Sequence, residues 1–112
     1  MKIRVDTKPV SVNQAYPSSK SGRRYLSLEG KTYKNLIGWM AKMEGGEVIT
    51  TPCKMVYTFG FTDKRRRDVD DYVKLTQDAL SGVWFEDDCQ ITEFTAKKVQ
   101  SDEYFVEIEM IV

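Results

Sequence analysis

The sequence contains no histidine. This absence excludes Ser-His and Cys-His nucleophile systems, His-ligated zinc and imidazole general bases. Any acid–base or metal chemistry must therefore use aspartate, glutamate, lysine or water. Only two cysteines are present, Cys53 and Cys89, and their separation matches no metal-ligand spacing. Both are predicted to be reduced thiols that pack as small apolar side chains.

The chain also lacks a long apolar run and an excess of either charge. The sequence contains no stretch of about 18 apolar residues that could span a membrane, and its N-terminal segment does not resemble a signal peptide. We therefore expect a cytoplasmic protein. Its 17 basic and 17 acidic residues exclude a uniformly basic nucleic-acid binder but permit a locally basic surface. A length of 112 residues, with 41% hydrophobic residues, is typical of one small globular domain, here expected to span residues 1–112.

The hydrophobic pattern predicts an α+β fold. Alternation predicts strands at 1–7 and 53–61, and two more at 90–99 and 104–112 that "QSDE" joins as a hairpin. A Pro- and Ser-rich loop is expected before the first helix. Two apolar stripes at helical spacing predict the helices: Tyr33, Leu36, Ile37, Met40 and Ala41, and then Val69, Tyr72, Val73, Thr76, Ala79 and Leu80. The result is a small mixed sheet covered by two helices.

The stretch "KRRRDVDDYVK", residues 64–74, concentrates both signs of charge. Asp68 and Asp70 are two residues apart across the expected strand-to-helix turn, so both carboxylates can point to the same side. Crowded carboxylates repel each other unless a cation lies between them. Mg²⁺ suits them, because it takes one or two carboxylates and keeps waters or phosphate oxygens. Asp88 is the third candidate ligand, because the segment after Leu80 is long enough to return along the helix.

The basic residues of the stretch fit a phosphate ligand. Arg65, Arg66 and Arg67 are candidates to hold DNA phosphates, since guanidinium groups match phosphate geometry. Lys74, one turn beyond Asp70, is placed to offset charge on a pentavalent phosphate or to orient the attacking water. Together with a bound metal ion, this predicts a phosphodiester hydrolase. Further candidates for phosphate contact precede the stretch: Lys20, Arg23, Arg24, Lys31 and Lys34.

Simpler readings stay open for each feature alone. Asp68 or Asp70 also fits a plain helix N-cap, and "EDD" at 86–88 fits a solvated turn. The arginine run also fits a generic surface patch, and the earlier basic residues fit a solvated loop and helix face. Trp39 and Trp84 are predicted to lie in the core or a dimer interface rather than to stack on bases.

The segment "RRRDVDDYVKLTQDALSGVWFEDDCQI" resembles the signature of the RusA family of Holliday-junction resolvases. That signature is an Arg-rich segment, D-x-D-N, a lysine four residues after the second aspartate, a "DAL" helix end, a turn containing glycine and an aromatic or apolar residue, and a D-D pair before a strand. "SVNQAY" and "SLEGKTYKN" also resemble the N-terminal part of the family, so the resemblance covers most of the chain.

The resemblance implies a small homodimeric endonuclease that depends on Mg²⁺, with Mn²⁺ as an alternative. Such an enzyme binds four-way DNA junctions and nicks two opposing strands symmetrically in recombination and repair, and many members are carried by phages or prophages. The family's acidic residues correspond to Asp68, Asp70 and Asp88, and its essential lysine to Lys74. Arg67 matches its last basic residue before the motif. Asp71 departs from the family's usual asparagine, which leaves its role as a ligand open.

Two other functions compete with this reading. A non-catalytic DNA-binding module would keep the basic face without cleavage, but the intact Asp68, Asp70, Asp88 and Lys74 argue against it. An enzyme acting on a small phosphorylated substrate is disfavoured by the absence of a Gly-rich phosphate loop.

Overall fold

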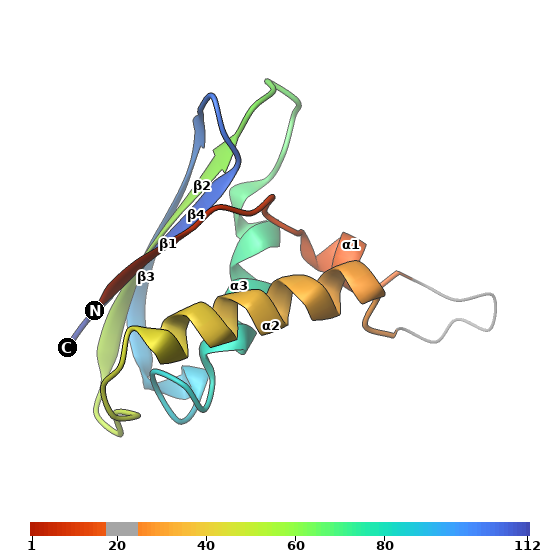
Figure 1. The fold of residues 1–112 in the computed structure, drawn as a ribbon. Coiled ribbons are helices and arrows are strands. Elements are labelled where there is room, and N and C mark those ends of the chain that lie inside the picture. The colour runs from red at the N-terminus through yellow and green to blue at the C-terminus, as the bar shows by residue number, and fades with distance from the viewer. Residues whose placement is uncertain (18–24) are drawn as a thin grey trace.

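The computed structural model describes residues 1–17 and 25–112. Its sheet holds strands β1 (Lys2–Val5), β2 (Cys53–Phe61), β3 (Ile91–Gln100) and β4 (Phe105–Ile111) in the order β1-β4-β2-β3. β4 runs antiparallel to both of its neighbours, whereas β2 and β3 run parallel. The predicted mixed sheet of an α+β fold is confirmed (Figure 1).

The predicted hairpin of the last two strands is wrong, because β2 lies between them. β3 aligns with one side of β2, with Phe94 opposite Met55, and β4 aligns with the other side, with Ile108 opposite Tyr57. The link from Ser101 to Tyr104 crosses the end of β2, where the Ser101 N–H donates to the Phe61 carbonyl at 2.8 Å. A short link serves a hairpin and this crossover equally well, so its length does not distinguish them.

Two predicted helices are confirmed, and a short one was missed. α2 (Leu28–Met43) and α3 (Val73–Leu80) follow the predicted stripes, and the 3₁₀ helix η1 (Val69–Tyr72) leads into α3. A second 3₁₀ helix, η2 (Asp88–Gln90), precedes β3. The missed helix is α1 (Val12–Ala15), which Ser11 and Gln14 close with a capping box inside the segment expected to be a loop.

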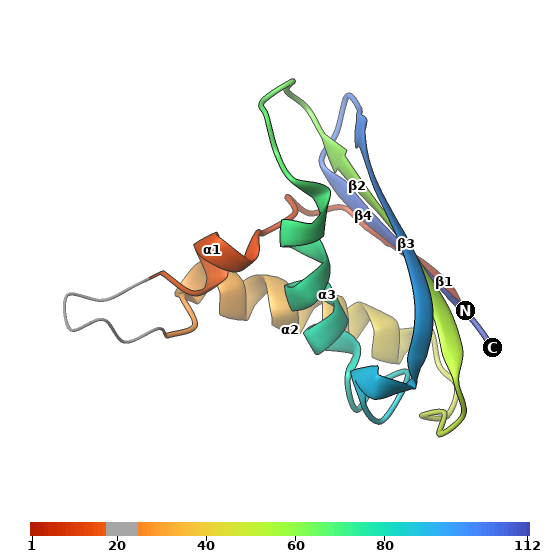
Figure 2. The same cartoon turned by 180° about the vertical axis from the view of Figure 1, so that it is seen from behind.

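All three α-helices lie on one face of the sheet (Figures 1 and 2). Alternate residues of β2, including Met55, Tyr57 and Phe59, are buried against them. α2 crosses α3 closely at Gly38, where a Cβ atom would lie 3.1 Å from the Ala79 carbonyl oxygen. The Tyr33 hydroxyl of α2 also hydrogen-bonds the Thr76 hydroxyl of α3 at 2.7 Å inside the core. These contacts hold α2 against α3, the helix in which the charged stretch ends.

The tryptophans and cysteines divide between core and surface. Trp84 is buried as predicted, and its indole N–H donates to the Ala41 carbonyl at 2.9 Å. Trp39 is 63% exposed, so it does not lie in the core of this chain. Both cysteines are free, and Cys53 is buried as predicted. The prediction that Cys89 packs inside is wrong, because η2 leaves its side chain exposed.

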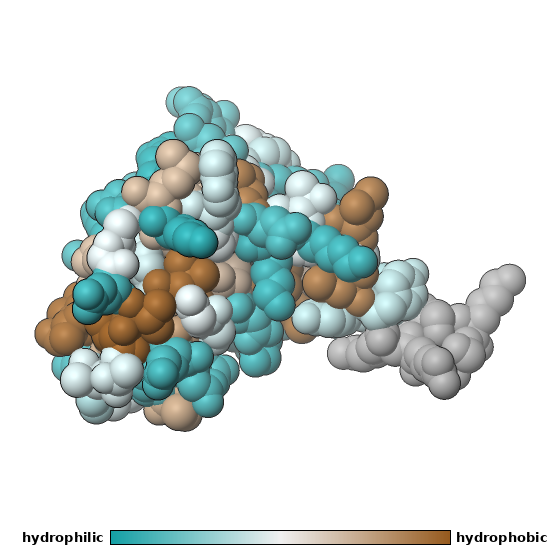
Figure 3. All heavy atoms as spheres, turned by 60° about the horizontal axis from the view of Figure 1, so that its bottom comes forward, coloured by the Kyte–Doolittle hydropathy of each residue, from teal (hydrophilic) through white to brown (hydrophobic). Residues whose placement is uncertain are grey.

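Apolar side chains also remain on the surface near both chain ends. Met43 is 63% exposed and Val112 is 78% exposed. Figure 3 shows apolar atoms gathered at its left, the side on which Figure 1 places both termini, with a smaller area toward α1. Of the helices in the described residues, none combines the length and the apolar character needed to cross a membrane.

Candidate active site

The arginine run lies on the loop from β2 to η1, and one of its members anchors that loop. Arg67 donates from both terminal nitrogens to the Asp63 carboxylate, at 2.5 and 3.2 Å, and its guanidinium carbon lies 4.2 Å from the centre of the Phe61 ring. These contacts leave the Arg67 side chain only 12% exposed. The Lys98 ammonium donates to the Arg67 carbonyl from β3. Arg67 is thus held within the protein.

The other members of the run face solvent. Lys64, Arg65 and Arg66 are exposed, and the Arg65 backbone N–H donates to the Asp63 carboxylate at 3.0 Å. The hydrogen bond from Arg67, followed by that from the Arg65 N–H, holds the pKa of Asp63 well below its usual range. An ionised Asp63 therefore fixes the loop that presents Arg65 and Arg66.

Lys74 and Asp88 come together although thirteen residues lie between them in the sequence. The Lys74 ammonium lies 3.6 Å from the Asp88 carboxylate and donates to the Asp78 carboxylate at 2.8 Å. The hydrogen bond to Asp78 is the main cause that raises the pKa of Lys74, and Asp88 adds to it. Lys74 is therefore a stable cation between two carboxylates at neutral pH.

The return of the chain to Lys74 depends on buried anchors. Gly82 has a φ of 80°, which allows the reversal after α3, and the Gly82 N–H donates to the Phe85 carbonyl at 2.7 Å. Trp84 and Phe85 are both buried. The Gln90 side chain then holds η2 in place: its amide donates to the carbonyls of Ile49 and Thr51, at 2.9 and 3.0 Å.

The remaining acidic candidates lie on η1 and are more open. Asp68 and Asp70 are exposed, and Asp71 is half-buried. Asp68 stands at the N-cap position of η1, but its side chain makes no capping hydrogen bond, so the plain N-cap reading has no support there. At "EDD", Glu86 and Asp87 are exposed as a solvated turn requires, whereas Asp88 is half-buried beside Lys74.

A ready-made metal site is not formed by these side chains. Within residues 1–17 and 25–112, no three Asp, Glu, Cys or His side chains gather closely enough to hold a metal ion. The three predicted ligands, Asp68, Asp70 and Asp88, thus do not form one cluster, and Asp88 is paired with Lys74. Carboxylate oxygens suit Mg²⁺ chemically, but the arrangement does not fit a preformed three-carboxylate site.

Comparison with known proteins decides the family. The family described as "Endodeoxyribonuclease RusA" matches residues 6–111. The chain belongs to the RusA family. Proteins named "Crossover junction endodeoxyribonuclease RusA" in Enterobacteria phage 82, Escherichia coli K12 and Shigella sonnei are each 31% identical to it over 94 residues, which is 81% of this chain and 77% of each relative.

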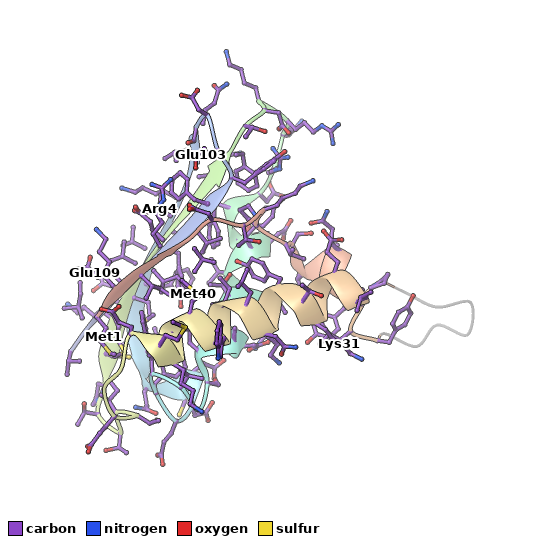
Figure 4. All side chains as sticks on the ribbon, viewed as in Figure 1. Met1, Arg4, Lys31, Met40, Glu103 and Glu109 are labelled. Carbon is purple, nitrogen blue, oxygen red and sulfur yellow. The ribbon has the colours of Figure 1, made fainter. Side chains whose placement is uncertain are left out.

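The RusA signature falls on both sides of the α3 N-terminus. The structure brings together its lysine, Lys74, and its last aspartate, Asp88. It does not bring Asp68 and Asp70 into that contact. Lys31 lies exposed on α2 and points away from the sheet (Figure 4). Arg4 and Glu109 instead lie on the face of the sheet that the helices do not cover. Lys20, Arg23 and Arg24 lie outside the described residues.

Sequence reasoning assigned no role in the candidate site to Asp78 or Tyr57. Asp78 follows Lys74 by four residues on a helix, a spacing that favours an ion pair and was a legible signal. Tyr57 gave no such signal, because it was expected only as a core aromatic. Its hydroxyl donates to the Gln77 side-chain oxygen at 2.8 Å, and burial, Cys53 and then Asp88 raise its pKa.

Proposed function

We propose that this chain is an endodeoxyribonuclease that resolves four-way (Holliday) DNA junctions in recombination and repair. Membership of the RusA family supports the reaction class. The observation that carries the proposal to particular residues is the contact of Lys74 with Asp88, the lysine and the last aspartate of the signature, which fold to 3.6 Å from one another. Exposed Arg65 and Arg66 lie on the loop before this site.

The proposed reaction is hydrolysis of a phosphodiester. Water adds to phosphorus, the bond from phosphorus to the leaving oxygen breaks, and a proton reaches that oxygen. Lys74 is proposed as the catalytic cation that offsets the charge growing on the phosphate, and its raised pKa keeps it protonated. Arg65 and Arg66 are proposed to hold neighbouring phosphates, and Arg67 to orient the loop that carries them.

A divalent cofactor is also proposed, Mg²⁺ or in its place Mn²⁺, with Asp68, Asp70 and Asp88 as ligands. When bound, the ion would supply Lewis-acid chemistry to the phosphate. Since the three carboxylates are not gathered into one group, binding would require them to move closer together. The role of Asp71 stays open.

A homodimer is the proposed assembly. A four-way junction is pseudo-twofold, and a C₂ dimer presents two identical sites to its symmetric strands. Paired symmetric nicks follow from that arrangement.

The test uses an end-labelled four-way junction and a linear duplex of the same sequence, each with Mg²⁺ or EDTA. We expect symmetric nicks in the junction only, dependent on Mg²⁺ and absent in Asp70→Asn. Asp102→Asn, which changes an exposed aspartate in the β3–β4 link, is the matched control and should cut like the parent protein. Tight junction binding without cleavage would favour a non-catalytic binding module, and failure to bind either DNA would refute the proposal.

A further inference from the structure

Trp39 presents an aromatic surface beside the place where α2 crosses α3. Its neighbours Ile37 and Ala41 are fully buried, whereas Trp39 is 63% exposed. Gly38, adjacent to it, is the point of close approach to Ala79. The indole therefore stands at the rim of the crossing of two helices, and no described contact of the core requires it.

A groove between the two helices places Trp39 among groups that suit a nucleotide. The residues that line this shallow groove include Trp39, Ala79 and Val83, together with two lysines, Lys34 and Lys42. Both lysines lie on α2, one on each side of Trp39 in the sequence. A flat aromatic surface flanked by cations is the combination that binds single-stranded nucleic acid, because the ring stacks on a base while the cations contact phosphates.

The groove adjoins the candidate active site at Asp78. Asp78 lines the groove, and its carboxylate accepts a hydrogen bond from Lys74 at 2.8 Å. Lys74 in turn lies 3.6 Å from Asp88. A strand whose phosphate reaches Lys74 would therefore lie next to the Asp78 end of the groove.

We propose that this groove binds an unpaired nucleotide at the branch point of the DNA, with its base stacked on Trp39 and its phosphates near Lys34 and Lys42. The inference rests on the proposed function and assigns the nucleotide next to the cut to a particular surface. A base inside a continuous duplex is held by pairing and stacking, whereas one at a branch point is released at less cost. Stacking on Trp39 thus favours a junction over a duplex.

Charge favours DNA over a second copy of the chain as the occupant. In a twofold contact centred on Trp39, the Lys34 and Lys42 side chains of both copies would converge. The carboxylate in the groove, Asp78, is already bonded to Lys74. A phosphate backbone instead complements both lysines.

The test measures binding without cleavage. A four-way junction carrying 2-aminopurine at the branch point is titrated with protein in EDTA, and a linear duplex is titrated in parallel. We expect Trp39→Ala to abolish the fluorescence change and to weaken junction binding roughly 5- to 140-fold, the range for loss of about 1–3 kcal/mol of base stacking. Duplex affinity should stay within about twofold, and Trp39→Phe should retain part of the effect.

Two matched variants sharpen the result. Met43→Ala changes an apolar residue of the same helix that is also 63% exposed, and it should leave the fluorescence change and junction affinity as in the parent protein. Lys34→Gln should keep the fluorescence change but reduce the slope of log affinity against log salt by about one. Emission from the buried Trp84 reports whether Trp39→Ala remains folded.

Parental fluorescence and junction affinity in folded Trp39→Ala would overturn the inference. So would a loss of dimers by Trp39→Ala in sedimentation without DNA, because the surface would then be a contact between copies. The proposed function fails separately, if the parent protein binds the junction with the expected fluorescence change but does not nick it with Mg²⁺. A parent protein that binds no DNA would refute both.

Discussion

Lys74 is the residue whose contacts are least explained by a contribution to stability. Its ammonium is exposed on a short helix, yet two carboxylates from different segments converge on it. An exposed ion pair contributes little to stability, so its loss should change chemistry far more than folding.

We therefore expect Lys74→Gln to lower junction cleavage by about 10²–10³-fold, the cost of removing one group that stabilises charge in a transition state. Junction affinity should change only several-fold. Single-turnover cleavage and gel-shift titrations measure the two effects. Lys54→Gln, which removes an exposed lysine paired with Glu93, is the control, and equal losses in both variants would contradict a special role for Lys74.

Asp63 is the second residue with a specific consequence, because it holds Arg67 and the Arg65 backbone together. Its lowered pKa means that this anchoring is fully present above the ordinary carboxyl pKa, near 4, and is lost only as pH falls through the lower folded value. The loop should therefore stay ordered from neutral pH down to mildly acidic pH.

Replacing Asp63 by asparagine should release the loop at neutral pH. Trypsin should then cut after Arg65 and Arg66 several-fold faster than in the parent protein, while urea unfolding of the whole chain changes little. Mass spectrometry of the fragments measures this, with Asp102→Asn as the control for loss of one surface carboxylate. Unchanged cleavage at both arginines would show that Asp63 does not order the loop.

At the scale of elements, the pairing of α2 with α3 positions both the candidate active site and the groove. The Tyr33 hydroxyl bonds Thr76, whose hydroxyl also donates to the Tyr72 carbonyl at 2.9 Å. Burial raises the pKa of Tyr33, as expected for a neutral phenol that bridges two helices.

Tyr33→Phe should lower the free energy of unfolding by about 1 kcal/mol, the net value of one buried hydrogen bond. Urea denaturation followed by circular dichroism measures the change. Tyr25→Phe, at a tyrosine that is 53% exposed, should have no measurable effect. Equal stability of Tyr33→Phe and the parent protein would mean that this hydrogen bond does not help to hold the helices.

The elements also show what the sequence could and could not predict. Helical periodicity located α2 and α3, because each buries one stripe. Strand alternation shows which side of a strand is buried but not which strand is its neighbour, so β3 and β4 were wrongly paired. The mostly polar sequence of β3, ITEFTAKKVQ, was the available sign of an edge strand, and its residues are mostly exposed.

The candidate site was predictable in its parts but not in its assembly. The charged stretch and the aspartate after the turn were visible in the sequence, and the distance that the chain could span was calculable. The contact of Asp88 with Lys74 depends on Trp84, Phe85 and Gln90, which lie in or beside the turn. Trp84 and Gln90 hydrogen-bond remote segments of the chain, at Ala41 and Ile49, and Phe85 is buried. Periodicity carries no information about such anchors.

At the scale of the whole molecule, the sheet joins segments that are far apart in the sequence. The first strand pairs with the last, with Ile3 opposite Ile108. The Met1 ammonium also donates to the Met110 carbonyl at 3.1 Å. Residues from both ends of the chain thus complete the sheet against which α2 and α3 pack.

The central place of β4 sets the order in which this nuclease matures. β4 separates β1 from β2, so neither has its antiparallel neighbour until residues 105–111 have emerged from the ribosome. Pairings between segments so far apart in sequence form slowly, because a long loop must close first. We therefore expect a nascent chain that still lacks residues 105–111 to be inert toward DNA, and cutting ability to arise only after β4 has paired with both of its neighbours.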